Sequence, residues 1–450
     1  MSKVVKLRNG LNIRIRGKAE KIFVKSDLAE KYALQPTNFP GLTPKLTVKV
    51  DDVVKAGTPL FYDKYRPEVL FTSPVSGKVS AINRGERRRI LEVVVDADRE
   101  IQYETFRQAD PSGLSREEVI ENLLKSGLWP YIRQRPYAII ANPADTPKAI
   151  FISCFDTSPL APDYDFIVKE EAESFQKGID ALSKLTSGKV HLGLNADYPP
   201  SNVFNQAKGV EVTFFKGKHP AGNVGVQIHH IDPVNKGDVV WYLYPQDVIT
   251  IGRLFSKGVV DMSRIVALTG SEVKNTRYYK TMTGASIKDM VKDNVEEGEL
   301  RYISGNVLTG SKIYNEGYVG FYDSQITVIP EGNFCEFLGW SMPGFNKYSV
   351  SRTFLAWLMP GKEFRINTNL KGGNRAFVLT GQYEQVIPMD ILPVQLLKAI
   401  IVEDIDLMEN LGIYEVAEED FALCDFVCVS KIETQTIIRK GIDLMIRETT

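Results

Sequence analysis

The sequence is poor in cysteine and has no long apolar run. No apolar stretch approaches the roughly 18 residues that a membrane-spanning helix needs, and residues 1–10 lack the hydrophobic centre of a signal peptide. The only cysteines are Cys154, Cys335, Cys424 and Cys428. Their spacing forms no disulfide framework, which favours a reducing compartment. We therefore expect a soluble, cytoplasmic chain that other proteins would have to anchor if it works at a membrane.

An excess of charge of one sign is also missing. The chain has 55 Lys and Arg against 56 Asp and Glu, a formal net charge of -1, so no overall field would attract nucleic acid. We expect no nucleic-acid partner. The local basic run at residues 84–89 is predicted to be a solvated hairpin. The alternative for this run is a contact with a partner or with anionic lipid.

The motifs of independent chemistry are absent as well. The sequence has no G-x-G-x-x-G after a strand, no G-x-x-x-x-G-K-S/T and no H-E-x-x-H, and no Ser-His-Asp or Cys-His pattern can be assembled. An iron–sulfur cluster needs about four thiolates, whereas Cys424 and Cys428 lie four residues apart without C-x-x-C spacing. We therefore expect buried free thiols, no catalytic residue, no metal and no cofactor bound by this chain.

Residues 48–82 carry the most distinctive pattern in the chain. Short alternating strands flank a Gly or Pro turn in each half of this stretch, so each half is predicted to form a β-hairpin. The pattern resembles the lipoyl/biotinyl carrier fold, a flattened barrel-sandwich, which we place at residues 1–100. In carriers the tip between the halves holds a modified lysine, and Lys64 lies there, although Pro67 alters the exit. We expect a docking module without cargo, with modification of Lys64 as the alternative.

The rest of the 450 residues predicts three further units. Strands that alternate with helices, such as 149–153 followed by 166–185, predict a doubly wound, Rossmann-like α/β domain at residues 101–262. Residues 263–380 are predicted as a β-grasp (SLBB-type) unit and a β-rich region, and residues 381–450 as a small C-terminal helical domain. The expected strands of the β-rich region include 325–329, 336–340, 353–357 and 376–379. The predicted fold class is therefore multidomain α/β.

The densest polar cluster is the run that contains His229, His230 and Asp232. Adjacent histidines on an extended chain point in different directions and rarely chelate one metal, so one of them is expected to cap a turn. The functional alternative is a His and Asp pair that hydrogen-bonds a quinone carbonyl or relays its proton. Trp241 and Tyr242 could then line an apolar pocket for the headgroup. The alternative for these two aromatic residues is a place in the core.

The order of these segments resembles one family over nearly the whole chain, the NqrA subunit of the sodium-translocating NADH:quinone reductase, Na(+)-NQR. The stretches that carry the resemblance are 48–82, 229–233, 240–241, 246–255, 298–310 and 424–428. The layout is similar to that of the sister subunit in the Rnf complex, whose iron–sulfur cysteine motifs are missing here. It is also similar to the flavin-binding subunit of respiratory complex I, whose glycine-rich flavin loop is missing here.

The resemblance implies a peripheral subunit at the cytoplasmic face of the bacterial inner membrane. The family's six-subunit complex oxidises NADH, reduces ubiquinone or menaquinone and exports sodium. Its flavins, iron centres and NADH belong to other subunits, and quinone is a candidate ligand of this one. The implied partners are the other five subunits, especially the membrane subunit that carries quinone and flavin. No activity of the isolated chain is expected. The alternatives are a carrier modified on Lys64 and an Rnf-type electron-transfer subunit.

Overall fold

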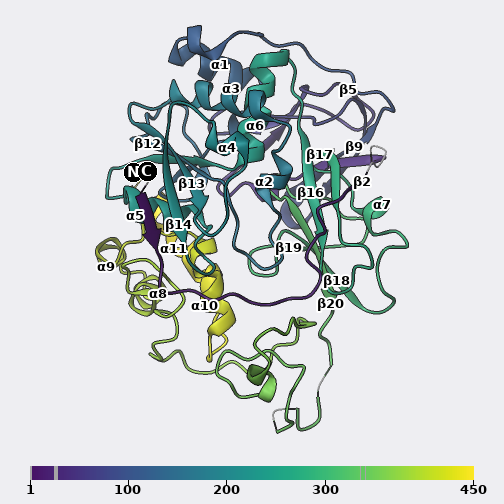
Figure 1. Cartoon of the computed structure of the whole chain (residues 1–450). Helices are drawn as coiled ribbons and strands as arrows, with labels where there is room; N and C mark the ends of the chain where they lie inside the picture. The colour runs from purple at the N-terminus through teal and green to yellow at the C-terminus, as the bar shows by residue number, and fades with distance from the viewer. Residues whose placement is uncertain (1–2, 25–28, 335, 340, 450) are drawn as a thin grey trace.

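The computed structural model describes residues 3–24, 29–334, 336–339 and 341–449, which form a mixed α/β molecule with a helical C-terminal end (Figure 1). The largest apolar core runs through the N-terminal module, the main α/β sheet and the sheet that follows. A second core holds the C-terminal helices together. The predicted mixture of β-modules, an α/β unit and a helical end is confirmed at this level, while the finer Rossmann-like and β-grasp assignments stay predictions.

Two small antiparallel sheets form the N-terminal module, in the orders β3-β9-β8-β5 and β4-β6-β7. Their strands are β3 (Lys31–Leu34), β4 (Pro44–Leu46), β5 (Val53–Val54), β6 (Pro59–Asp63), β7 (Leu70–Thr72), β8 (Gly77–Arg84) and β9 (Ile90–Ala97). The prediction of a hairpin in each half of residues 48–82 is wrong, because β5 pairs with β8 and β6 pairs with β7. The Gly and Pro turns instead carry the chain from one sheet to the other, so that both sheets cover one core.

The two true hairpins of this module lie at its tip and at the basic run. Strands β6 and β7 pair across the tip that holds Lys64, and β8 pairs with β9 across residues 84–89. The side chains of Arg84, Arg87, Arg88 and Arg89 are exposed. The predicted hairpin is therefore confirmed with its arginines exposed, and whether it contacts a partner or anionic lipid stays untested.

The main sheet has seven strands in the order β1-β14-β13-β12-β15-β10-β11. The first five are parallel, and β10 and β11 add an antiparallel edge. The strands are β1 (Lys3–Lys6), β10 (Arg133–Arg135), β11 (Ile139–Ile140), β12 (Ala149–Ser153), β13 (Lys189–Asn195), β14 (Val210–Lys216) and β15 (Val240–Leu243). The helices of this unit are α1 (Arg116–Ser126), α2 (Tyr164–Ile167), α3 (Ala172–Ser183), α4 (Asn202–Asn205), α5 (Val224–Ile231) and α6 (Pro245–Lys257).

Helices cover both faces of this sheet. Helices α3 and α6 pack on the face that carries Ile150 and Leu192, and α5 packs on the face that carries Phe151. A Cβ on Gly178 of α3 would lie 2.2 Å from the carbonyl oxygen of Val248 in α6. The missing side chain at Gly178 therefore lets the backbones of α3 and α6 meet.

The third unit is a six-stranded mixed sheet in the order β19-β18-β20-β16-β17-β2. Its elements are β2 (Phe23–Val24), β16 (Ser263–Thr269), β17 (Tyr278–Met282), α7 (Lys288–Val291), β18 (Leu300–Ser304), β19 (Ser311–Ile313) and β20 (Gln325–Pro330). Strand β16 lies in this sheet, where it pairs with β17 and β20. The N-terminal segment contributes β1 to the main sheet and β2 to this one.

The segment between β20 and the C-terminal helices has little regular structure. The described residues from 331 to 380 contain one 3-10 turn, η5 (Leu355–Leu358), and no strand. The predicted strands at 353–357 and 376–379 are therefore wrong, and the described part of 336–340 forms no strand either. A strand needs a neighbour for its backbone hydrogen bonds, and none is provided here.

The helical end agrees with its sequence pattern. It consists of α8 (Pro393–Ile401), α9 (Ile405–Asn410), the 3-10 helix η6 (Glu418–Phe421), α10 (Ala422–Val427) and α11 (Thr434–Thr449). Pro393 occupies the first turn of α8, where its missing N–H costs nothing. Helix α11 buries Ile438, Ile442 and Met445 against this end's own core.

Candidate functional site

The predicted histidine pair lies in the last turn of α5, and the extended chain assumed for it is wrong. His229 is 2.7 Å from Glu415 Oε2 through Nδ1, and its Nε2 accepts the backbone N–H of Asp390 at 3.0 Å. Since Nε2 accepts, Nδ1 carries the proton that is donated to Glu415. His229 therefore uses both ring nitrogens to fasten α5 to the helical end.

His230 has one ring nitrogen engaged and one open. Its Nδ1 lies 2.9 Å from the carbonyl oxygen of Val226, to which it must donate. Burial lowers the pKa of His230, so the ring is neutral at neutral pH and Nε2 holds a lone pair. No described residue bonds to that Nε2. A neutral His230 can therefore accept a hydrogen bond from a hydroxyl, such as that of a quinol, but cannot donate one to a quinone carbonyl from this atom.

Asp232 ends α5 in an ion-pair cluster centred on Lys148. The ammonium of Lys148 lies 2.9 Å from Asp232 and 2.9 Å from Asp238, and it also donates to the carbonyl oxygen of Pro233 at 2.7 Å. Burial acts to lower the pKa of Lys148, but hydrogen bonds to the two carboxylates raise it overall. The cluster therefore holds the loop after α5 against the residue that precedes β12.

The structure separates the two predicted aromatic residues from each other. Trp241 packs edge to face with Trp129 at 5.4 Å in the large core. Tyr242, the next residue on β15, faces α5 on the other side of the sheet. Both are fully buried, so they line no common pocket. His229, His230 and Asp232 share one helix end, and quinone contact at any of these residues stays a prediction.

A group of residues that the sequence analysis missed lies where the parallel strands end. The guanidinium of Arg133 stacks over three tyrosine rings, at 4.6 Å from Tyr242, 5.2 Å from Tyr244 and 4.2 Å from Tyr322. Its Nε and Nη2 are buried without a hydrogen-bond partner among the described residues. In open α/β sheets ligands bind at the carboxyl ends of the strands. Arg133 is therefore a donor at such an edge, suited to an anionic or carbonyl oxygen.

Arg135, two residues along β10, has the opposite environment. Its Nη1 lies 3.0 Å from Asp420 and its Nη2 lies 2.9 Å from Glu419, both in η6 of the helical end. Burial raises the pKa of Glu419, while the charge of Arg135 opposes that rise. Arg135 thus joins the main sheet to the helical end through buried ion pairs. Two arginines, at 133 and 135, with only Gln134 between them were the sequence signal for this junction.

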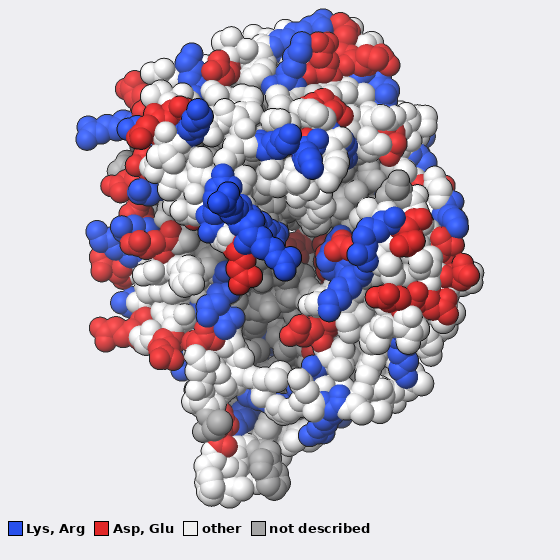
Figure 2. All heavy atoms as spheres, turned by 180° about the vertical axis from the view of Figure 1, so that it is seen from behind, with Lys and Arg blue, Asp and Glu red and all other residues white. Residues whose placement is uncertain are grey.

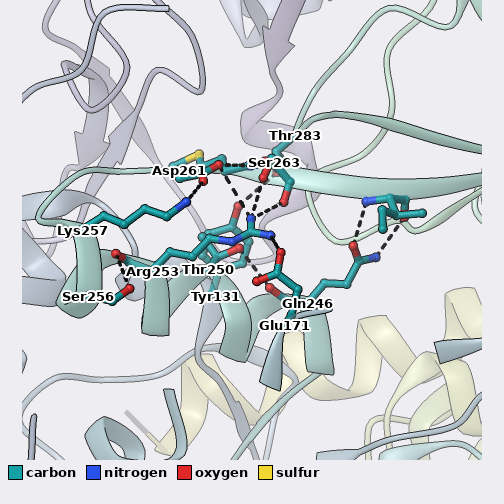
Figure 3. A network of polar contacts seen from close by, with 12 residues as sticks. Tyr131, Glu171, Gln246, Thr250, Arg253, Ser256, Lys257, Asp261, Ser263 and Thr283 are labelled. Atoms are coloured by element: carbon teal, nitrogen blue, oxygen red, sulfur yellow. Dashed lines mark hydrogen bonds and ion pairs between the residues drawn. The ribbon is translucent and has the colours of Figure 1, made fainter. Parts of the chain in front are cut away.

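A second polar network joins the main sheet's helices to the third unit (Figure 3). Arg253 of α6 donates to the carbonyl oxygen of Ser263 at 2.9 Å and pairs with Glu171. Asp261 lies between Lys257, at 2.8 Å, and the N–H of Ser263, at 3.1 Å. Burial would raise the pKa of Asp261, but the charge of Arg253 and the bonds from Lys257 and Ser263 lower it to about 2. The border between the two units is therefore fixed by ionised, bonded groups.

Three of the four cysteines can be described, and all three are buried. Burial raises the pKa of the Cys154 and Cys424 thiols, which keeps them protonated. Cys428 Sγ accepts the hydroxyl of Tyr383 at 2.9 Å. Cys335 lies outside the described residues. Within the described part of the chain, no three His, Cys, Asp or Glu side chains gather in a metal-binding arrangement.

Lys64 is exposed at the tip of the N-terminal module, with its ammonium 5.2 Å from the ring of Tyr65. The neighbouring Asp63 is buried and accepts the backbone N–H of Tyr65 at 3.2 Å. The tip is therefore a fixed turn with an accessible lysine.

On the face opposite to that in Figure 1, charges of both signs alternate, and Lys and Arg gather around a central hollow (Figure 2). Among the described helices, none combines the length and the apolarity that crossing a bilayer requires. The fold thus defines a modular α/β protein whose units meet through buried charge.

Comparison with known proteins identifies the family. Family models match residues 5–98 ("NqrA N-terminal barrel-sandwich hybrid domain"), 114–260 ("NqrA second alpha/beta domain") and 265–315 ("NQRA C-terminal domain"). The chain is 41% identical over 450 residues to the NqrA subunit of the Na(+)-translocating NADH-quinone reductase of Pasteurella multocida, and 42% identical to that of Neisseria meningitidis serogroup B. Each alignment covers 99% of this chain and 100% of the relative. The chain belongs to the NqrA family.

A solved structure of NAD+-reducing NiFe hydrogenase in the H2-reduced state is a more distant neighbour. It matches with a TM-score of 0.38 and 11% identity, over 75% of this chain and 62% of that chain. A likeness at this level carries no conclusion about function.

Proposed function

We propose that this chain is the peripheral NqrA subunit of a six-subunit Na(+)-translocating NADH:quinone oxidoreductase. In that complex it docks partner subunits, above all the membrane subunit that carries quinone and flavin, at the cytoplasmic face of the bacterial inner membrane. The observation that carries the proposal is the full-length similarity, at 41–42% identity, to relatives that bear this subunit's name. NADH oxidation, quinone reduction and sodium export are activities of the whole complex.

The proposed role of this subunit is contact with its partner subunits. The NADH, flavins and iron centres are proposed to be bound by those partners. Of the buried charges, Arg135, Arg253 and Arg264 are each paired with a carboxylate of this chain. These groups hold the domains together and are not free to bind a cofactor.

Co-expression of the chain with the other five subunits tests the proposal. We expect the chain to co-purify with a tag placed on a membrane subunit. We also expect protease to digest it in inverted membrane vesicles and to spare it in right-side-out vesicles. Failure to co-purify, or digestion from the outer side, would refute the assignment.

Quinone contact at the end of α5 is a second proposal, and the open Nε2 of His230 beside Asp232 favours it. Calorimetric titration of the purified chain with a short-chain ubiquinol and the matching ubiquinone tests it. We expect the quinol to bind more tightly than the quinone, and His230→Ala to remove the difference. Asp238→Ala is the matched control, since it removes the other carboxylate on Lys148 and leaves His230 in place. Equal binding by all variants would discard this position.

The two alternative functions have direct tests. A lipoyl or biotinyl group on Lys64 would add its mass to the intact chain, so an unmodified mass removes the carrier alternative. An Rnf-type electron-transfer subunit would absorb visible light through its iron–sulfur clusters. A colourless purified chain removes that alternative.

A further inference from the structure

The exposed apolar side chains of this protein are concentrated in one segment. Among the described residues of 334–379, twelve large hydrophobic side chains are exposed. Phe337 is 91% exposed and Trp357 is 50% exposed. The twelve are Phe334, Phe337, Leu338, Met342, Phe345, Val350, Leu355, Trp357, Leu358, Leu370, Val378 and Leu379. We call these side chains the apolar lobe. A concentration of this kind on a soluble surface marks an interaction site.

The segment that carries the lobe is held firmly to the body of the protein. Phe364 pairs with Ile15 in an isolated bridge, and Arg365 makes two bonds, of 2.7 and 2.8 Å, to the buried Glu272. Near the far end, Arg375 donates its N–H to the carbonyl oxygen of Ser430 at 3.1 Å. Figure 1 shows the segment projecting away from the sheets, below β20. The segment is therefore tied to the body of the protein at these three points.

We propose that the apolar lobe is the surface with which this chain docks on the cytoplasmic side of a membrane-embedded partner subunit. This inference rests on the proposed function and adds the surface that performs it. The occupant is a protein face with an apolar centre and an acidic rim.

The charge of the segment argues for the acidic rim. Residues 334–379 contain six Lys and Arg but only two Asp and Glu. Lys347 pairs with Glu336, and Arg365 pairs with Glu272. The other four cations have no ion pair with a described residue. They are Arg352, Lys362, Lys371 and Arg375. A second copy of the chain would bring the same positive segment, which disfavours self-association through this surface.

The backbone argues against the lipid interior as the occupant. Between residues 331 and 380 the described backbone forms only the 3-10 turn η5 as regular structure. Irregular backbone does not enter hydrocarbon, because its N–H and C=O groups would lose their hydrogen bonds. A protein partner can bury the apolar side chains and also bond these backbone groups.

The test measures binding of the full chain to the five-subunit complex that lacks it, purified in detergent and immobilised for interferometry. We expect Phe337→Ser and Trp357→Ser each to weaken binding by about tenfold or more, as for anchors at the centre of an interface. Tyr314→Ser is the matched control, because Tyr314 is 81% exposed outside the segment, and we expect it to bind like the wild type. Circular dichroism melts confirm that each variant is folded.

A charge variant gives an independent readout. Arg352 lies over the ring of Trp357 at 5.6 Å. We expect Arg352→Glu to slow association and to reduce its dependence on salt, since it removes attraction to the acidic rim. An unchanged association rate and salt dependence would refute the inference that the partner's surface has an acidic rim.

The outcomes separate failure of the inference from failure of the proposed function. If the wild-type chain does not bind the five-subunit complex, the proposed function fails. If it binds and the lobe variants bind equally well, the function stands and the lobe is discarded. Binding of the wild type, but not of the variants, to protein-free vesicles of phosphatidylethanolamine and phosphatidylglycerol would make lipid the occupant and overturn the inference. Dimers of the wild type that the variants abolish would overturn it in favour of a second copy.

Discussion

The junction at Arg135 and the apolar lobe differ in how their side chains are covered. At the junction, the fully buried Arg135 and Asp420 pair with each other, and the partly buried Glu419 also pairs with Arg135. In the lobe, apolar side chains remain in water although their segment is fixed to the same body. The difference teaches that the junction finds its partners within this chain, whereas the side chains of the lobe have no covering partner in the described chain. Four measurements can break or sharpen this contrast.

The largest expected effect is at the junction. Asp420→Ala removes one of the two carboxylates on Arg135, which is itself fully buried. We expect the free energy of unfolding to fall by about 3–5 kcal/mol, because a buried charge loses its partner. Urea unfolding measures it. The double variant Arg135→Met with Asp420→Leu is the control and is expected to lose less than the single one. A loss below about 1 kcal/mol for Asp420→Ala would show that the junction does not depend on pairing.

A buried histidine gives the next largest effect. His219 lies 3.1 Å from Thr157 Oγ1 through Nδ1, and burial lowers its pKa to about 4. The folded pKa is below the unfolded value of about 6.5. The neutral, buried imidazole therefore contributes stability that is present above pH 6.5 and is lost as the pH falls towards 4. We expect the free energy of unfolding to fall by about 2 kcal/mol between pH 7 and pH 5 through this group.

The comparison with His219→Gln isolates this contribution. Glutamine does not titrate, so the difference in free energy of unfolding between wild type and variant should shrink by that amount over the same range. A difference that stays constant from pH 7 to pH 5 would contradict the assignment.

The anchor of the lobe should have a smaller effect. Arg365 is largely exposed, whereas its partner Glu272 is buried and retains a bond from Ser271. We expect Arg365→Ala to cost about 1 kcal/mol of stability, through the carboxylate left with fewer partners. Limited proteolysis should cut the lobe segment faster in this variant. Arg352→Ala, which breaks no ion pair of the described chain, is the control and should be cut at the wild-type rate.

The smallest effect on stability is expected in the lobe itself. Phe337→Ser should change the free energy of unfolding by no more than about 0.5 kcal/mol, because an exposed side chain contributes little packing. Thermal and urea unfolding measure it. A large loss of unfolding free energy would mean that Phe337 packs against the folded chain, which would contradict the contrast between junction and lobe.

Local sequence patterns predicted many of the elements. Ser115 caps α1 in a capping box with Glu118, and Gly127 ends the helix in the left-handed conformation, as their types and spacing predict. The apolar run at 149–153 is a fully buried strand. Residues 11–17 alternate apolar and polar side chains, which is typical of a strand, and they bury Ile13 and Ile15. The strand does not form, because Ile15 makes only an isolated bridge with Phe364.

The candidate site was less predictable than the fold. The pair His229 and His230 was found by its density, but the assumed extended chain hid the fact that His229 binds Glu415, 186 residues further along. Arg133 was missed because its importance lies in having three tyrosine rings around it, one of them Tyr322 in another unit. Neither environment exists in the local sequence.

The sequence by itself determined the ends of capped helices such as α1, which strands are apolar, the balance of charge and the family resemblance. These properties depend on a few neighbouring residues or on the order of motifs. Only the tertiary structure decided which strands pair, that Arg135 meets Asp420 across 285 residues, and that the residues of the apolar lobe remain uncovered. The physical reason is that pairing and burial are set by partners distant in the chain, which local preferences do not specify.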